Sequence, residues 1–177
     1  FNNVHSLQNL TIPFVGQTID SNNSVESVIG YLFGDTINED YETLFEEINQ
    51  VYDADDTVKY FIPVGLTFIK VTDAEFIGYG AFSDCSNIEE VMITSNVIDT
   101  IYNRAFKDSG ILEMRIPNTV KSIKSEAFMN CLRLANVRYI GGTTIETIEK
   151  STFENCPKLI VNSIPDSVII IGDRAFF

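Results

Sequence analysis

The chain has 177 residues, a hydrophobic content of 45% and a formal net charge of −13 at pH 7. Length and apolar content are typical of one ordered domain rather than a disordered segment, and no apolar run approaches the ~20 residues of a membrane helix. The acidic balance argues against a nucleic-acid partner, because such binding depends on Lys and Arg that neutralise phosphates.

Residues 1–13 are predicted to form a partial repeat with one strand, because their apolar residues follow an order that returns later in the chain. The order Phe1, Val4, Leu7, Leu10 and Ile12 matches Phe128, Cys131, Leu134, Val137 and Tyr139. Leu10 and Ile12 alternate with polar residues, which is the period-2 pattern of a half-buried strand. We therefore expect this strand to stand beside the strands of the later repeats.

Residues 14–58 form an acidic insertion between this partial repeat and the rest of the chain. The first 58 residues contain 11 Asp and Glu and no Lys or Arg, whereas residues 59–177 contain 14 acidic and 12 basic residues. The acidity of the protein therefore belongs to its N-terminal part.

Two short helices are predicted in the insertion. Ser24 stands where a helix N-cap is expected and Gly34 where a helix ends, and Thr36 with Glu39 has the spacing of a capping box. The apolar residues at helical intervals are Val25, Val28, Ile29, Leu32 and Phe33 in the first helix and Tyr41, Leu44, Phe45, Ile48 and Tyr52 in the second. We expect both helices to pack on the edge of the repeats, partly as a cap.

Residues 59–177 repeat with a period near 23 residues. The phenylalanines that mark the period are Phe82, Phe106, Phe128, Phe153 and Phe176, at spacings of 24, 22, 25 and 23 residues. Five residues before each stands an isoleucine, namely Ile77, Ile101, Ile123, Ile148 or Ile171, and three after the first four stand Cys85, Ser109, Cys131 and Cys156. A shorter unit without its own Phe fits Leu66, Ile69 and Val71. Such periodicity predicts stacked structural units that bury a continuous core.

Each unit is predicted to contain one half-buried strand and one turn around its Phe. Val91 and Ile93 alternate with polar residues, as strand residues do, and Pro117 ends the equivalent strand of the next unit. Residues 125–130 are too few for a stable isolated helix, so we expect a helical turn or 3-10 segment there. Asn162 stands where a core strand favours Val, which predicts a weak strand at that point.

Stacking these units predicts an α/β repeat solenoid with one parallel sheet and short helical or 3-10 segments. We expect a single domain over residues 1–177. Its parts are the partial repeat 1–13, the insertion 14–58 and the stacked repeats 59–177.

One full repeat contains Leu112, Met114, Ile116, Pro117, Val120, Ile123, Ala127, Phe128 and Cys131. In this order and spacing the repeat resembles the BspA-type leucine-rich repeat family, over residues 59–177 and 1–13. The resemblance implies a bacterial cell-surface or secreted protein that takes part in protein–protein interaction or in adhesion to host molecules or cells. The sequence has no initiator Met and no signal peptide, so we expect it to be a piece of a longer protein whose flanks carry the anchor.

No catalytic, cofactor-binding or metal-binding residue is predicted, and we do not expect an enzyme. The one histidine, His5, falls in a predicted surface turn, which leaves little basis for a Ser-His-Asp or Cys-His system. The three cysteines stand at the same position of successive repeats as Ser109, and their spacing is unlike that of a zinc site, so buried free thiols are favoured. A Cys131–Cys156 disulfide between neighbouring repeats is geometrically conceivable.

Residues 53–56 resemble the start of a calcium loop but lack its later Gly and Glu.

The outward face of the predicted sheet is the candidate partner-binding site. Its first row contains Lys70, Met92, Arg115, Arg138 and Ser163, and its second row contains Phe68, Glu90, Glu113, Asn136 and Val161. A basic centre on an acidic protein favours an acidic patch on the partner. The alternative is internal charge pairing, because Arg115 would lie beside Glu113 on the same face.

The leading hypothesis is therefore a non-catalytic extracellular or cell-surface module that binds a protein, for example a host matrix or cell-surface protein. The first alternative is a structural spacer that displays another domain of a longer surface protein. A carbohydrate-binding module is a weaker alternative, because Phe68 and Tyr102 are the only aromatic candidates for a sugar-stacking platform.

Overall fold

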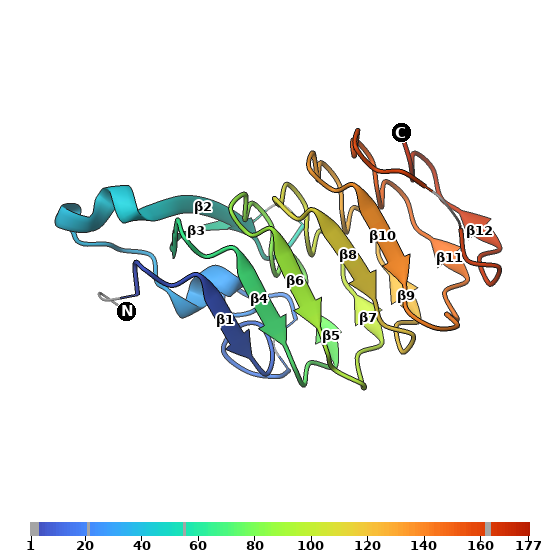
Figure 1. The fold of residues 1–177 in the computed structure, drawn as a ribbon, viewed down its shortest axis with the longest axis horizontal. Helices are drawn as coiled ribbons and strands as arrows, with labels where there is room; N and C mark the ends of the chain where they lie inside the picture. The colour runs from blue at the N-terminus through green and yellow to red at the C-terminus, as the bar shows by residue number, and fades with distance from the viewer. Residues whose placement is uncertain (1–3, 21, 55, 162–163) are drawn as a thin grey trace.

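The structure, a computed structural model, describes residues 4–20, 22–54, 56–161 and 164–177. It is a solenoid in which successive repeats lie side by side along one axis, with the N-terminal insertion at one end (Figure 1). The predicted fold class is confirmed.

The first parallel sheet contains the longer strand of each repeat. Its strands are β1 (Asn9–Ile12), β4 (Phe68–Val71), β6 (Glu90–Ile93), β8 (Glu113–Ile116) and β10 (Asn136–Tyr139). β1, β4 and β6 are hydrogen-bonded neighbours, as are β8 and β10, and each pair is in register, for example Lys70 beside Met92. The partial repeat thus contributes the strand that the sequence predicts.

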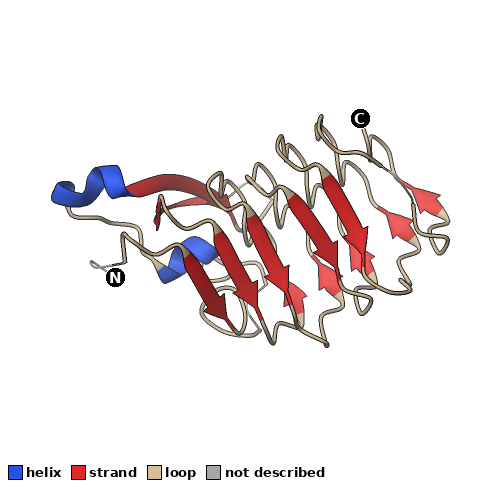
Figure 2. Ribbon diagram, viewed as in Figure 1, coloured by secondary structure: helices blue, strands red, loops and turns tan. Residues whose placement is uncertain are grey.

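The sequence predicts one parallel sheet, but a second parallel sheet runs along the opposite side of the solenoid (Figure 2). It consists of β5 (Phe76–Ile77), β7 (Thr100–Ile101), β9 (Ser122–Ile123), β11 (Thr147–Ile148) and β12 (Ile170–Ile171). Each strand is two residues long and ends at the repeat's Ile. Such a short extended segment gives no periodic signal of its own, but identical positions in neighbouring repeats align and pair.

The stacked phenylalanines form the centre of the core. Rings of consecutive repeats lie 5.2, 5.1, 5.2 and 5.4 Å apart between centroids, with interplanar angles of 3–15°. Phe82, Phe106 and Phe128 are fully buried, and Phe153 is 3% exposed. Each repeat therefore offers an aromatic surface to the next one, in the offset-stacked range that aromatic pairs prefer.

The segment around each Phe is a run of turns, where the sequence predicts a helical turn or a 3-10 segment. Glu126 and Asn130, on either side of Phe128, have φ of 60° and 61°, and equivalent residues in the neighbouring repeats are also left-handed. Left-handed residues break the run of right-handed dihedrals that a helix needs. The turns instead bond to each other, because the Phe106 N–H donates to the Ala127 carbonyl at 2.8 Å and the Phe128 N–H to the Thr152 carbonyl at 2.9 Å.

The insertion contains two 3-10 helices and a hairpin. The helices are η1 (Ile29–Leu32) and η2 (Glu39–Leu44), and the antiparallel strands are β2 (Phe45–Val51) and β3 (Thr57–Pro63). The prediction that the second helix continues to Tyr52 was wrong. Residues 45–51 pair with residues 57–63, so that Ile48 lies beside Tyr60, and the apolar spacing that matched a helix serves a strand.

This insertion caps the first Phe-containing repeat. In later repeats, turn carbonyls accept N–H groups from the preceding repeat. For the first one, the Ile29 N–H donates to the Ala81 carbonyl at 2.9 Å, and the fully buried Gln50 amide donates to the carbonyls of Ala81 and Ser83 at 3.2 and 3.1 Å. Gln50 also accepts the Gly30 N–H at 2.7 Å. The insertion therefore supplies the donors that a preceding repeat would supply.

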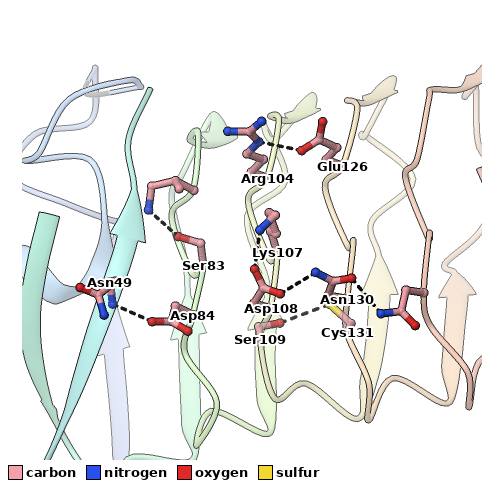
Figure 3. Close-up of polar contacts among 12 residues, drawn as sticks. Asn49, Ser83, Asp84, Arg104, Lys107, Asp108, Ser109, Glu126, Asn130 and Cys131 are labelled. Carbon is pink, nitrogen blue, oxygen red and sulfur yellow. Dashed lines mark hydrogen bonds and ion pairs between the residues drawn. The ribbon is translucent and has the colours of Figure 1, made fainter. Parts of the chain in front are cut away.

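Asp and Asn side chains make two separate sets of hydrogen bonds, one between the cap and the first turn and one between later turns (Figure 3). In the first set, the Asn49 backbone N–H on β2 donates to the Asp84 carboxylate at 2.7 Å. Two repeats further on, the Asn130 amide donates to Asp108 at 2.8 Å and accepts from Asn155 at 3.0 Å. The four turn residues, Asp84, Asp108, Asn130 and Asn155, hold left-handed backbone positions that Asp and Asn tolerate better than most residues.

Candidate functional site: a groove in the exposed sheet face

The strands of the first sheet have one buried and one outward face. Ile69, Val91 and Met114 point into the core and are at most 2% exposed. The residues that alternate with them point outward, and their neighbours across the strands are those that the sequence predicts: Phe68 beside Glu90, Lys70 beside Met92, Glu113 beside Asn136 and Arg115 beside Arg138. Ser163, the last residue of the first predicted row, lies outside the described residues, as does Asn162.

Charge on this face is organised around Glu113. Its two carboxylate oxygens bind the Nε atoms of Arg115 at 2.9 Å and of Arg138 at 3.2 Å. The pKa of Arg115 is raised above its ordinary value, first by the hydrogen bond that Arg115 donates to Glu113 and then by the charge of Glu113, with the charge of Glu90 adding a smaller effect. The charge pairing within the face, between Glu113 and the two arginines, is thus present. The negative charge of Glu113 neutralises part of the predicted basic centre.

A groove of about 760 Å³ lies along the boundary between β6 and β8. Its volume is within the range of ligand-binding clefts. The lining includes five of the predicted face residues, namely Phe68, Glu90, Met92, Glu113 and Arg115, together with Leu112, Ile140 and the loop residues 94–96 and 117–119. Lys70 and Arg138 belong to the same face but do not line the groove.

The groove exists because the first sheet is interrupted. Among the described strands, β6 and β8 adjoin each other without forming a ladder. In other repeats the N–H of the residue after the strand donates to a carbonyl of the preceding repeat. The Thr94 N–H donates to the Val71 carbonyl and the Ile140 N–H to the Ile116 carbonyl, both at 2.9 Å. In the repeat of β8 this residue is Pro117, which has no N–H to donate to Ile93.

Different loops also separate the ends of β6 and β8. The loop from Ile93 to Ile98 is one residue longer than the loop from Ile116 to Val120. Its extra length is accommodated by Ser95, which is buried and donates its hydroxyl to the Ala74 carbonyl at 2.6 Å. Pro117 and the longer loop can both be identified in the sequence. Only the stacking of the repeats places them at the same boundary, between β6 and β8.

The one histidine and the three cysteines are not among the residues that line the groove. His5 stacks on Tyr41 at 5.7 Å, at the insertion rather than the groove. No three His, Cys, Asp or Glu side chains of the described residues form a group suited to a metal ion. Burial raises the pKa of the Cys85 and Cys131 thiols, and Cys156 is only half-buried. None of the described helices is long and apolar enough to cross a bilayer.

Comparison with known families gives a match over most of the chain. Residues 59–177 match the model of the BspA type leucine-rich repeat region, in six copies. The chain belongs to the BspA-type leucine-rich repeat family. This family is associated with bacterial surface proteins, and leucine-rich repeat domains in general are non-enzymatic scaffolds that mediate protein–protein binding.

A solved structure of a leucine-rich repeat protein gives the same fold. A leucine-rich repeat protein from Bacteroides ovatus is 24% identical over 62% of this chain and 34% of its own, with a TM-score of 0.52. A leucine-rich repeat protein from T. pallidum is 23% identical over 62% of this chain and 61% of its own, with a TM-score of 0.44. This BspA-type chain thus spans about a third of the Bacteroides ovatus protein. A search of curated proteins found no match.

Proposed function

We propose that this chain is a non-catalytic adhesion module of a bacterial surface or secreted protein, and that its exposed sheet face recognises a protein partner. The observation that carries the proposal is the groove of about 760 Å³ between β6 and β8 in the outward sheet face. Specific interfaces are built around such recesses, where a buried anchor from the partner contributes most of the binding energy.

Arginines beside the groove are suited to contact a partner. The side chains of Arg115 and Arg138 are 59% and 62% exposed, and the Glu113 carboxylate holds both through Nε. Because Glu113 binds the Nε atom of each arginine, the two Nη groups of each guanidinium stay available. These two groups can then bind both oxygens of a carboxylate of the partner. Arginine is enriched among the residues that contribute most to interfaces. The acidic remainder of the protein would repel anionic surfaces and direct them to this patch.

The test is a charge-reversal double variant, Arg115→Glu/Arg138→Glu, compared with wild type for adhesion to a panel of host matrix proteins and to partner cells. The matched control is Lys121→Glu/Lys158→Glu, which changes the net charge equally at exposed positions away from this face. Thermal melts of all three proteins establish that the fold is retained.

We expect the face variant to lose at least about tenfold in affinity and the control to bind like wild type. Equal binding of the face variant and wild type would move the site elsewhere, with the insertion 14–58 as the next surface to test. Absence of binding by wild type to every panel member would favour the structural spacer.

A further inference from the structure

Glu90 is an uncommitted carboxylate at the edge of the groove. Its side chain is exposed and makes no hydrogen bond or ion pair among the described residues, although its charge has a small effect on Arg115. The neighbouring carboxylates are already engaged, because Glu113 binds two arginines and Glu89 binds Arg133 at 2.6 Å. The β6 side of the groove therefore has a free negative charge, whereas Arg115 on the β8 side has a positive one.

Apolar side chains line the groove, with Phe68 and Leu112 beside this charge and Ile140 toward the other end of the strands. Leu112 is 38% exposed and Ile140 is 50% exposed, and both line the groove together with the partly exposed Phe68 and Met92. These four side chains come from four different repeats. They offer a large apolar side chain of a ligand a site in which it can leave water, which stabilises binding by about 25 cal/mol per Å² of apolar surface.

The groove also offers hydrogen-bonding groups that match a polypeptide backbone. The Ile93 carbonyl lacks the donor that other repeats supply, because Pro117 has no N–H. Asn96 and Asn118 are exposed in the two loops that line the groove, and each amide can both donate and accept. An extended segment presents alternating N–H and C=O groups that such positions can satisfy.

We propose that the groove binds an extended segment of a protein partner in which a large apolar residue is followed by a Lys or Arg. The apolar side chain lies against Phe68 and Leu112, which flank Glu90 in the two neighbouring repeats, and the cation pairs with Glu90. Arg115 repels a cation on the opposite side, which fixes the direction of the segment across the sheet. The inference rests on the proposed function in that it assigns the chemistry of the partner at the same face.

The experiment uses short peptides with blocked ends and is independent of any natural partner. One peptide contains a leucine followed by a lysine, a second has glutamate in place of the lysine, and a third has serine in place of the leucine. Binding is measured by amide chemical shifts of isotopically labelled protein. We expect the leucine–lysine peptide to bind most tightly, with shifts concentrated at residues 90–96 and 112–119.

Two variants of the protein assign the preference to Glu90. Glu90→Lys is expected to weaken the leucine–lysine peptide by about tenfold, the usual effect of one charge-assisted hydrogen bond, and to favour the leucine–glutamate peptide. The matched control, Glu75→Lys, changes the net charge equally at an exposed position outside the groove and should leave the order of the peptides unchanged. Both positions are exposed, so both variants are expected to fold.

Specific results would overturn the inference. Equal binding of the three peptides, shifts outside the groove, or an unchanged preference in Glu90→Lys would each show that the groove does not select this segment. If these occur while Arg115→Glu/Arg138→Glu still abolishes adhesion, the proposed function stands and only the assignment of the partner segment fails. If the peptides behave as expected but the double variant adheres like wild type, the groove assignment stands and the arginine patch is wrong.

Discussion

The repeats 59–177 and the insertion 14–58 bury their backbone polar groups by different means. In the repeats, each turn bonds to an identical turn of the next unit, as the Phe106 N–H bonds to Ala127 and the Phe128 N–H to Thr152. In the insertion, the buried Gln50 side chain and the Ile29 N–H perform the same task for the first Phe-containing repeat. The repeats therefore rely on identity between neighbours, whereas the cap relies on groups that occur once in the chain.

This difference predicts how substitutions act. A repeat position is supported by two neighbours of the same kind, so a substitution there affects both adjoining interfaces, while other repeats keep their own contacts. A cap position has no equivalent elsewhere in the chain. Its loss exposes one end of the hydrogen-bonded array and leaves the interior repeats intact.

The largest effect is expected for Phe128→Ala in the middle of the aromatic stack. Removing this ring, which lies 5.1 and 5.2 Å from its two neighbours, should lower the free energy of unfolding by about 3–5 kcal/mol. Chemical denaturation measures the loss. Phe128→Leu is the matched control, because it retains much of the volume and should cost less. An unchanged midpoint for the alanine variant would contradict the burial of this column.

A smaller effect is expected for Gln50→Leu in the cap. Leucine fills similar space but leaves the Gly30 N–H and the Ala81 and Ser83 carbonyls without the bonds that Gln50 makes. Each buried group without a partner costs about 1–3 kcal/mol, and relaxation of the cap limits the total to roughly 2–4 kcal/mol. Hydrogen exchange should accelerate at residues 29–30 and much less at the β9 amides. Asn49→Ala, an exposed side chain on the same strand, is the control and should have little effect.

The repeats could be predicted well from the sequence because each position of the repeat occurs several times along the chain. The Phe spacing fixed the stacking and the outward rows, and the register of β4 with β6 and of β8 with β10 agrees with it. The hairpin was not predictable in the same way. The apolar spacing of residues 41–52 satisfies a helix, and only pairing with residues 57–63 decides for a strand. In the sequence Gln50 is an ordinary polar residue, and only the folded structure shows that it bonds to carbonyls of the first Phe-containing repeat.

The site was predicted only in part. The alternation within strands identified its outward residues, including Met92 and Arg115. It did not predict the groove, because two local signals, Pro117 and the longer loop around Ser95, combine only after the repeats are stacked.

A modest effect is expected for the cysteine column. Replacing Cys85, Cys131 and Cys156 together with Ala should keep the fold at a cost of about 1 kcal/mol per buried thiol, because the column accepts Ser109 in one repeat. Native protein treated with a thiol reagent should react first at Cys156, which is only half-buried and whose pKa is lowered by a hydrogen bond with Cys131. Mass spectrometry locates the label. First reaction at Cys85, whose pKa burial raises, would contradict the structure.

The smallest effect concerns pH at the junction of the cap and the first Phe-containing repeat. Burial raises the pKa of Glu46 above its ordinary value of 4.5, and the charge of Asp84 raises it further, against a hydrogen bond from Ser86 that lowers it. Burial also raises the pKa of Asp84, with Asp108 adding to the shift and the Asn49 N–H opposing it. Folding therefore favours the protonated form of both carboxyls, because their pKa values are higher in the folded than in the unfolded chain.

Acids with a raised folded pKa contribute stability that is present below their unfolded pKa and is lost as the pH rises through the folded pKa. Glu46→Gln removes this titration while keeping an oxygen that can accept the Ser86 hydroxyl. The stability of the variant relative to wild type should therefore increase from pH 4 to pH 7, by less than about 1 kcal/mol because solvent screens a half-exposed group. Glu47→Gln on the same strand, with its side chain 52% exposed, is the control and should show no such trend. Paired denaturation curves across this pH range measure the difference, and a flat difference for Glu46→Gln would mean that Asp84 alone carries the pH dependence of the junction.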